Sequence, residues 1–482
     1  MHFNIIARIL GILLMIFSLT LFPPILVSLY YQDGTTAEFA LAFMLTFSTG
    51  LACWAPARNT RQELRIRDCF LIVTLFWTVL GSFGAIPFFV SEELDLSLTD
   101  AIFESISGLT TTGATVLSGL DTLPKALLYY RQQLQWLGGM GIIAIAVAIL
   151  PMLGIGGMQL YKAESPGPVK DNKLMPRVTE TAKALLYIYV TLTGVCAAAY
   201  LLAGMTPFDA LGHSFATIAI GGFSTHDSSI GYFDSMAVDM IASFFMLISG
   251  VNFSLHFFTW RHLSIRHYFR DAEFRFYMGL MAFVSLVTVL TLIATSTYSP
   301  LDAIVNGVFE VISIGTTTGF GTADFHNWPT FLPFLLFYLA IIGSCAGSTG
   351  GGMKVIRIVL IIKQGFREIR RLVHPSAIIP VKLGNEKVPD RVLESVWGFF
   401  SVYVMAYMAM LLALLATGLD ITTAFTAVGA SINNLGPGLG EVTQTYGSLP
   451  SSAKWILCFG MLLGRLEIFT LLVLFSPHFW RR

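Results

Sequence analysis

The sequence predicts an all-α integral membrane protein in which four similar units follow an N-terminal hairpin of two helices. One observation is the composition: 55% of the 482 residues are hydrophobic and 12% are charged, against roughly 25% charged residues in a typical soluble domain. A soluble protein of this size could not bury so much apolar surface. The other observation is a short amphipathic stretch leading to a glycine, which recurs four times at intervals of roughly a hundred residues.

Long apolar runs give the expected spans, because one crossing of a bilayer needs about 20 apolar residues. The first run, 9–30, follows Arg8 and lacks the small-residue cleavage site of a secretory signal, so we expect a retained helix. The other runs, which bring the expected total to ten crossings, are 37–54, 69–90, 132–157, 184–203, 236–258, 276–297, 329–362, 392–417 and 453–478.

These crossings divide the chain into five parts. A transmembrane hairpin comes first, and each later part is expected to hold a span, a short re-entrant pore helix, a glycine segment and a second span. The parts are the hairpin 1–68, repeat 1 at 69–160, repeat 2 at 161–260, repeat 3 at 261–375 with an intramembrane gating loop, and repeat 4 at 376–482.

The cations indicate the orientation, because Lys and Arg accumulate in cytoplasmic loops. Most of the 29 Lys and Arg residues fall on one side, at Arg8, in alternate loops and at the C-terminus. Those loops are 55–68, 161–183, 259–275 and 363–391. The opposite loops carry acids, and their cations are Lys125, Arg131 and Lys454. We therefore expect a multi-pass membrane protein with both termini cytoplasmic.

Several function classes are excluded by the sequence. The 29 acidic residues balance the cations, so no basic field for nucleic acid exists. The five cysteines form no C-x-x-C pair, and the sequence has neither an H-E-x-x-H motif nor a nucleotide-binding phosphate loop. No nucleophile and base stand out on one face, so we do not expect an enzyme.

Repeats 1 and 3 share the pattern F-E-x-I-S-x-x-T-T-T-G. In both, nine residues separate the glutamate from the glycine, Glu104 from Gly113 and Glu310 from Gly319. The second copy leads from Asp209 to Gly222, and the fourth is placed at Gly436 mainly by its position between two spans. The alternative is that the glycines mark tight loops and the threonine runs cap helices.

Four such segments around one axis would provide rings of backbone carbonyls. Irregular backbone at membrane depth is tolerated where it is buried in protein or lines an aqueous path. Backbone carbonyls can replace the hydration shell of a monovalent cation, and glycine permits the conformation that points them inward. The segments therefore favour an ion pathway.

The residues from about 70 to 480 resemble the Trk/Ktr/HKT superfamily of potassium transport proteins, in particular the membrane subunit of bacterial Trk uptake systems. The extra hairpin is similar to the Trk branch rather than to the shorter Ktr branch. The resemblance implies one potassium-selective filter, with one segment and one glycine per repeat. Gly113 is intact where a serine accompanies sodium preference in the plant branch, which favours potassium.

Carried over by position, the resemblance implies two sets of filter residues. The backbone carbonyls that would bind K+ as metal ligands belong to Thr111, Thr112, Ile220, Gly221, Thr317, Thr318, Asn434 and Leu435. The rest of the selectivity filter would comprise Thr110, Gly113, Ala114, Thr115, Ala219, Gly222, Phe223, Ser224, Thr316, Gly319, Phe320, Gly321, Asn433, Gly436, Pro437 and Gly438.

The long run 329–362 contains a candidate gate. Three consecutive glycines, 350–352, interrupt it, and each glycine disfavours a helix by about 1 kcal/mol relative to alanine. We expect a broken helix with a flexible loop under the filter, which the resemblance supports as a gate. The alternative is close helix packing through small residues. The expected gate residues are Gly343, Gly347, Gly350, Gly351, Gly352, Lys354 and Arg465.

Charges within the apolar runs are functional candidates by default. We expect Arg465, in the last span, to contact the 343–353 loop and to add an electrostatic barrier below the filter. Neutralisation by buried carbonyls is the alternative. Glu467 is two residues away and so points elsewhere on the helix.

The 363–391 loop is the richest in cations. It could follow the orientation rule alone, but it also resembles a docking surface for the family's cytosolic nucleotide-binding regulatory subunit. Any NAD or ATP dependence would then belong to that partner, with no nucleotide bound by this chain. The resemblance further implies a homodimer located in the bacterial inner (cytoplasmic) membrane. The basic cations of this loop include Arg367, Arg370, Arg371, Lys382 and Lys387.

The expected function is potassium uptake through a selective, gated, channel-like pore driven by the electrochemical gradient. A potential of about 150 mV supplies roughly 3.5 kcal/mol per ion without an ATPase. The alternative is symport of K+ with H+ or Na+, for which Glu104 and Glu310 are the symmetric titratable candidates.

Overall fold

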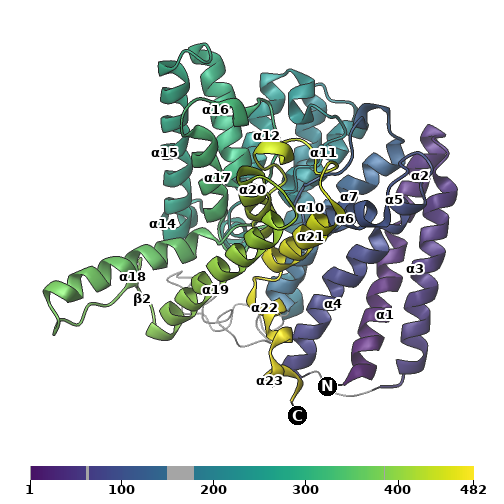
Figure 1. Ribbon diagram of the computed structural model, residues 1–482, viewed down its shortest axis with the longest axis horizontal. Helices are drawn as coiled ribbons and strands as arrows, with labels where there is room; N and C mark the ends of the chain where they lie inside the picture. The colour runs from purple at the N-terminus through teal and green to yellow at the C-terminus, as the bar shows by residue number, and fades with distance from the viewer. Residues whose placement is uncertain (1, 61–64, 149–177, 385, 482) are drawn as a thin grey trace.

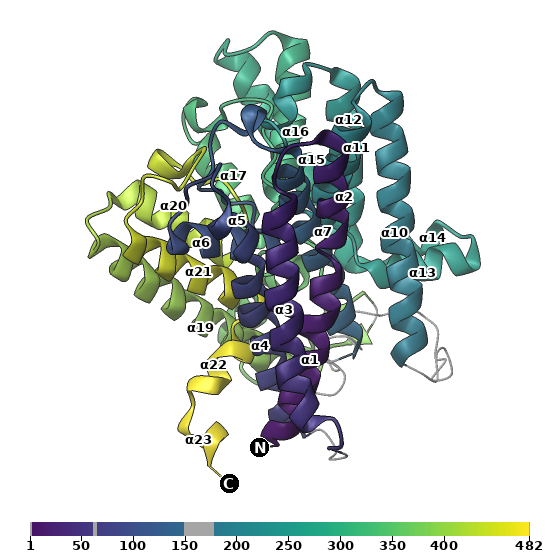
Figure 2. The same ribbon diagram turned by 90° about the vertical axis from the view of Figure 1, so that its right-hand side faces the viewer.

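The computed structural model describes residues 2–60, 65–148, 178–384 and 386–481, which are almost entirely helical (Figure 1). The two termini lie close together at one end of the molecule (Figures 1 and 2). The end of the expected run 132–157 and most of the basic loop 161–183 lie outside the described residues.

The N-terminal hairpin consists of one span, formed by α1 (Phe3–Leu19) and α2 (Phe22–Tyr31), and a second span, α3 (Thr36–Ala57). Helices α1 and α3 touch through two glycines. A Cβ at Gly11 would lie 2.6 Å from the carbonyl oxygen of Gly50, and a Cβ at Gly50 would lie 2.9 Å from that of Gly11. Small residues let helix backbones approach closely where van der Waals packing holds membrane helices together.

Four short helices are each followed by one of the predicted glycine segments. They are α6 (Leu98–Leu109), α11 (Pro207–Ala219), α16 (Pro300–Gly315) and α20 (Ile421–Ile432), with 12 to 16 residues each. At 1.5 Å per residue they measure about 18–24 Å, less than the bilayer core of about 30 Å.

The four short helices begin in the same way. The side chains of Ser97, Thr206 and Ser299 accept the backbone N–H three residues later, and Asp420 accepts two N–H groups of its first turn. In the first three helices, the capping hydroxyl also donates to the aspartate at that third position. Such caps satisfy N–H groups that have no partner within the helix.

The remaining elements surround these helices or lie at the ends of the chain. The other helices of ten or more residues are α4 (Ile66–Gly84), α7 (Lys125–Ala148), α10 (Val178–Leu202), α12 (Met236–Ser249), α13 (Phe253–His262), α15 (Ala272–Ala294), α17 (Leu332–Ile342), α18 (Val355–Val373), α19 (Asp390–Leu415) and α21 (Ser451–Arg465). The shorter elements are α5 (Ile86–Val90), α14 (Arg266–Arg270), α22 (Phe469–Leu472), α23 (Pro477–Trp480), η1 (Leu120–Thr122), η2 (Ser229–Phe233), η3 (Phe325–Asn327), η4 (Gly440–Val442), η5 (Val473–Phe475), and a hairpin of β1 (Lys382–Leu383) and β2 (Glu386–Lys387).

Within the described residues, six helical stretches are long and apolar enough to cross a membrane, or eight if each of two sharply bent pairs counts as one span. The bends are 94° between α12 and α13 and 109° after α21. Two expected crossings are absent from this set. Helix α7 carries Arg131 and three glutamines that are buried in the protein, and α17 ends after 11 residues at the intramembrane loop.

The run 329–362 is broken, as the glycines predict. Residues 343–354 leave the helix between α17 and α18. The expectation of a loop over 363–391 is partly wrong, because α18 continues to Val373 and projects from the body of the molecule (Figure 1). Its basic outer half is amphipathic, so an apolar-run criterion does not detect it as helix.

Candidate functional site

The four glycine segments share one backbone conformation. The residue two positions before each glycine has a positive φ, at 52° for Thr111, 54° for Ile220, 68° for Thr317 and 51° for Asn434. The next N–H in each segment donates to the carbonyl five residues earlier, with every distance 2.8 Å. A positive φ is strained for β-branched residues such as threonine and isoleucine, and such strain clusters at functional sites.

The glycines bring neighbouring segments into contact in cyclic order. A Cβ at Gly113 would lie 2.1 Å from the carbonyl oxygen of Gly221, and one at Gly222 would lie 2.0 Å from that of Thr318. A Cβ at Gly319 would lie 2.6 Å from Cδ of Pro437. The ring closes where a Cβ at Gly436 would lie 2.7 Å from the carbonyl oxygen of Gly113.

The fourth segment differs in one respect. Gly113, Gly222 and Gly319 have φ angles of 82°, 77° and 84°, whereas Gly436 is not in the left-handed region. Its place is instead fixed by its neighbours: Asn434 donates from Nδ2 to the Thr112 hydroxyl at 3.1 Å and to the Met461 carbonyl at 2.9 Å.

The carbonyls that sequence analysis singled out lie in buried residues. Of these eight carbonyls, that of Gly221 accepts a hydrogen bond within the described part of the chain, from the side-chain amide of Gln135 at 2.6 Å. The others accept none from this part of the chain. Buried carbonyls in proteins are nearly always paired, so this set is suited to a cation. They belong to Thr111, Thr112, Ile220, Thr317, Thr318, Asn434 and Leu435.

The first residue of each segment lies at the end of its short helix, and later residues of the segments line a cavity. Thr110, Thr316 and Asn433 cap the C-termini of their short helices, and Ala219 is the last residue of α11. A cavity of about 600 Å³ on the side of the acidic loops is lined from all four segments, by Gly113, Ala114, Thr115, Gly222, Phe223, Ser224, Gly319, Phe320, Gly321, Gly436 and Pro437. Gly438 is not among its lining residues, and its N–H donates to the carbonyl of Val442.

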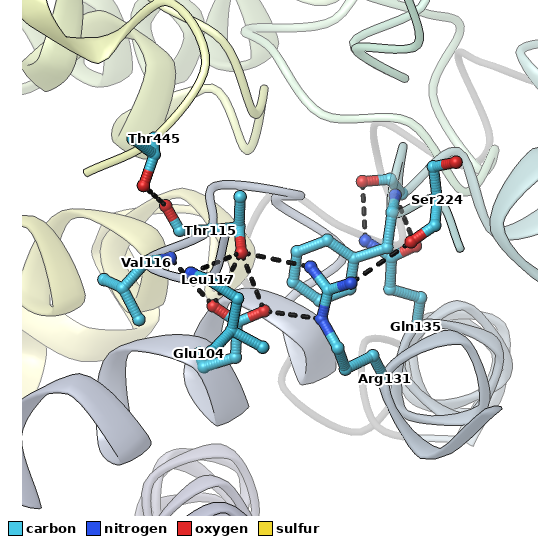
Figure 3. A network of polar contacts seen from close by, with 10 residues as sticks. Glu104, Thr115, Val116, Leu117, Arg131, Gln135, Ser224 and Thr445 are labelled. Carbon is cyan, nitrogen blue, oxygen red and sulfur yellow. Dashed lines mark hydrogen bonds and ion pairs between the residues drawn. The ribbon is translucent and has the colours of Figure 1, made fainter. Parts of the chain in front are cut away.

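A buried ion pair supports the first two segments (Figure 3). Arg131 of α7 places Nε 2.7 Å from the carboxylate of Glu104 on α6. The same guanidinium donates to the carbonyl of Ser224 at 3.1 Å and to the hydroxyl of Thr115 at 3.0 Å. Glu104 also accepts the N–H of Val116 at 2.9 Å. The pair thus fixes residues just beyond two filter glycines.

Glu310 occupies the corresponding position in repeat 3 but has different surroundings. Its Oε1 accepts the N–H groups of Thr322 at 2.8 Å and Ala323 at 3.1 Å. Its Oε2 is buried and, within the described residues, has no hydrogen-bond partner. The two glutamates that share a sequence pattern are therefore not equivalent in structure.

Two cations that we assigned to the opposite loops lie inside the protein. Arg131 is 1% exposed within α7, and Lys454 is 4% exposed in the first turn of α21, where its ammonium contacts Asp100 and the carbonyl of Gly447. The assignment to loops was wrong because helices α7 and α21 begin before these residues, at Lys125 and Ser451.

The 343–354 loop lies against the segments on the side opposite the large cavity. The Thr349 hydroxyl donates to the carbonyl of Ile218 at 2.9 Å, and the N–H of Gly351 donates to the Thr317 hydroxyl at 2.7 Å. A Cβ at Gly351 would lie 1.9 Å from the carbonyl oxygen of Asn433. The loop therefore packs directly on the third and fourth segments and on the end of α11, just before the second segment.

The other predicted gate residues lie in or beside this loop. Gly343, Gly347 and Gly352 have φ angles of 73°, 71° and 77°, and a Cβ at Gly350 would lie 2.4 Å from the Ser344 hydroxyl. Arg465 donates from Nη1 to the carbonyl of Thr349 at 3.2 Å, so the predicted contact between Arg465 and the loop is present.

Two further intramembrane cations are held next to Arg465. The ammonium of Lys354 donates to the carbonyl of Gly350, and Arg357 lies 2.7 Å from Glu467. Glu467 thus pairs with Arg357 of α18; the expectation that it points away from Arg465 along one helix was wrong in its reason, because α21 ends at Arg465 and Glu467 lies beyond it with a φ of 52°. A small cavity of about 50 Å³ is lined by all four of these residues and by Asn434.

Comparison with known proteins gives concordant matches. The family model described as TrkH, cation transport protein, matches residues 35–482. A Trk system potassium uptake protein TrkH from Halomonas elongata is 60% identical over 482 residues, covering 100% of both chains, and the TrkH of Escherichia coli K12 is 56% identical with the same coverage. The crystal structure of the potassium transporter TrkH from Vibrio parahaemolyticus has a TM-score of 0.93 at 53% identity, with 100% of both chains covered.

Proposed function

The chain belongs to the TrkH family of cation transport proteins, and we propose that it takes up potassium through a selective, gated pore. The membrane fold expected from composition is confirmed by this membership and by the match to a solved transporter. The family is one of transporters rather than enzymes. The carbonyls at the centre of the ring carry the proposal, because they are buried and, among the described residues, nearly all lack a donor.

Potassium is the proposed cargo, and the four segments are the proposed filter. Each segment contains one non-glycine residue with a positive φ, and each glycine lies so close to the next segment that a Cβ there would clash with it. The ring is therefore a preformed structure. Carbonyl rings of this kind replace the hydration shell of an ion. The large cavity on the acidic side would supply hydrated ions to it.

The loop 343–354 is the proposed gate. It packs on the filter segments from below, and Arg465 adds a positive charge beside it. A guanidinium in a narrow pathway opposes the passage of a cation, so the loop and Arg465 together would close the pore in this conformation. Opening would require the loop to leave the filter.

The cytoplasmic partner is proposed to be the nucleotide-binding regulatory subunit of a Trk system, with the protein itself a homodimer of the inner membrane. The basic helix α18 projects from the body and carries Arg370 and Arg371 toward its end (Figure 1). The two termini lie on the same side as each other (Figure 1), and both are proposed to be cytoplasmic.

Coupled symport with H+ or Na+ is the second candidate. The observation that favours it is Oε2 of Glu310, a buried carboxylate oxygen with no partner among the described residues. Glu104 does not favour it, because Arg131 already compensates its charge.

Current through single molecules in planar bilayers distinguishes the two candidates. A pore should pass roughly 10⁶ or more ions per second, faster than alternating-access steps on the μs–ms timescale allow. Strict coupling of K+ flux to a fixed number of protons or sodium ions, with no resolvable unitary current, would overturn the pore proposal.

A further inference from the structure

Glu273 of α15 joins three parts of the candidate gate through one carboxylate oxygen. Its Oε1 accepts the N–H of Ala346, in the loop, at 2.8 Å, and the N–H of Ile356, in the first turn of α18, at 3.2 Å. The side chain is 3% exposed. Ala346 and Ile356, ten positions apart on the two sides of the loop, are thus both bound to α15 through the same carboxylate.

The bond to Ile356 has a specific physical role. The first N–H groups of a helix have no partner within it, and a carboxylate at that end interacts favourably with the helix dipole. Lys354, the residue before α18, makes no side-chain capping bond. Glu273 therefore caps α18 from another helix, where the local sequence provides no cap.

The stems of the loop are held by further backbone bonds. Across the stems, the N–H of Val355 donates to the carbonyl of Ser344 at 3.1 Å. From the corner between α12 and α13, the carbonyl of Gly250 accepts the N–H of Cys345, and the N–H of Phe253 donates to the carbonyl of Gly347, both at 3.0 Å. These contacts connect the stems to spans, and one further contact, from the Ser344 hydroxyl to the carbonyl of Thr316 at 3.1 Å, connects a stem to the third segment.

The tip, residues 348–352, has different partners. Thr349 bonds to Ile218 near the end of α11, Gly351 and Gly352 bond to the filter residues Thr317 and Asn433, and Arg465 bonds to the carbonyl of Thr349. Gly347 and Gly352, at the ends of the tip, have positive φ angles that glycine adopts without strain. The loop thus divides into stems that are held by spans and a tip whose hydrogen bonds, among the described residues, go to α11, the filter segments, Arg465 and the stems.

We propose that Glu273 is the positioning residue of the gate: its carboxylate clamps the two stems to α15, so that opening is a swing of the tip 348–352 between fixed ends. This inference rests on the proposed function of the loop as a gate. It adds the prediction that one buried carboxylate, remote from the filter, sets how often the pore opens.

The test compares Glu273→Ala, Glu273→Gln and Asp271→Ala in proteoliposomes and planar bilayers without a regulatory partner. Asp271 is the matched control, because it is a neighbouring carboxylate whose side-chain hydrogen bond, to the N–H of Phe274, caps the same end of α15 within that helix. Glu273→Ala should raise the open probability at least tenfold, about 1.4 kcal/mol. Glu273→Gln retains an acceptor oxygen for both N–H groups and should lie much closer to wild type, as should Asp271→Ala.

Unitary conductance and the K+/Na+ permeability ratio should stay unchanged in all three variants, because the filter is not touched. Equal effects of Glu273→Ala and Asp271→Ala, or a folded Glu273→Ala with wild-type open probability, would refute the positioning role. If the wild-type protein passes no unitary K+ current while Arg465→Ala also has no effect, the proposed gate itself fails, which is a different outcome.

Hydrogen exchange on the wild-type protein keeps the proposal testable if Glu273→Ala does not fold. The stem amides of Cys345, Ala346 and Ile356 should exchange more slowly than the tip amides of Gly351 and Gly352, because opening of the tip exposes only the latter. Equal protection of stems and tip in the wild type would contradict a swing between fixed ends.

Discussion

Arg131 and Glu104 form an ion pair in which both side chains are almost fully buried, at 1% and 0% exposed, with 2.7 Å between Nε and the carboxylate. The guanidinium also lies 4.2 Å from the ring centroid of Phe223 and donates to the carbonyl of Ser224. One side chain therefore connects the short helix of repeat 1 to the filter segment of repeat 2.

Removing one member of this pair should be severe. Arg131→Met leaves the Glu104 carboxylate buried without its cation, which costs roughly 3–5 kcal/mol in comparable buried pairs. We expect a large fall in the thermal midpoint of the detergent-solubilised protein and loss of K+ uptake. The double variant Glu104→Gln/Arg131→Met should recover part of the stability, since no charge then remains unpaired. A single variant as stable as wild type would contradict this account.

A side chain at Gly113 should damage selectivity through contact, not only through strain. Gly113→Ala places a Cβ 2.1 Å from the carbonyl oxygen of Gly221, so the first and second segments must separate. Gly119→Ala is the matched control: its φ is 71°, but the nearest atom to a new Cβ is at 3.7 Å. Both carry the cost of about 1–2 kcal/mol for an L-residue in this region.

The two variants should therefore diverge in the K+/Na+ permeability ratio measured from reversal potentials. We expect Gly113→Ala to lower it at least tenfold, about 1.4 kcal/mol of discrimination, and Gly119→Ala to leave it unchanged. A similar loss in both variants would show that backbone strain, rather than spacing of the segments, determines selectivity.

The elements of the fold that local patterns encode could be predicted from the sequence. The four short helices follow from their capping residues and apolar faces, and the break in 329–362 follows from Gly350, Gly351 and Gly352. The outer half of α18 was missed because an amphipathic, basic helix has the composition of a loop. Repeat boundaries and the roles of the filter residues remain predictions.

Contacts between residues that are far apart in the chain could not be predicted from the single sequence. Arg131 was placed in a loop because only its charge was visible, whereas its partner Glu104 lies on a different helix. The contact of Glu273 with Ala346 joins residues 73 positions apart. Burial and pairing of such charges depend on how helices pack, and no periodicity within one helix records that packing.

Arg465 should restrict flux through its charge near the loop. Arg465→Ala removes the bond to the Thr349 carbonyl and the positive charge below the filter, so K+ flux into vesicles without a partner should rise about tenfold or more, or about 1.4 kcal/mol. Arg391→Ala, at an exposed position of α19, controls for loss of one cation. Unchanged flux in Arg465→Ala would show that the guanidinium is only neutralised by the loop.

A histidine outside the spans should make stability depend on pH. His226 contacts Asp121 and lies 3.4 Å from Asp209, so it connects the outer loops of repeats 1 and 2. Burial alone would lower the pKa of His226, but the nearby carboxylate of Asp209 and the hydrogen bond with Asp121 raise it above the ordinary value of 6.5. Hydrogen bonding with His226 in turn lowers the pKa of Asp121 below its ordinary value of 3.8.

The signs of these shifts define the expected pH range. The contribution of His226 is complete below pH 6.5 and is lost as the pH rises through its raised pKa, while that of Asp121 is present above pH 3.8 and is lost in acid. The thermal midpoint should therefore fall in the wild type as the pH rises above 6.5. His226→Gln should remove this part of the dependence, and an unaltered slope in that variant would assign it to other groups.

Glu310 and Glu104 offer a direct test between pore and symporter. Glu310→Gln keeps an oxygen that can accept the N–H groups of Thr322 and Ala323, so a passive pore should retain its fold and its K+ flux. Glu104→Gln instead removes the negative charge that compensates the buried guanidinium of Arg131, so the free energy of unfolding should fall. Uptake is measured in vesicles with and without an imposed pH gradient. If Glu310→Gln abolishes a dependence on that gradient while K+ binding persists, the carboxylate of Glu310 carries protons and coupled symport replaces the pore.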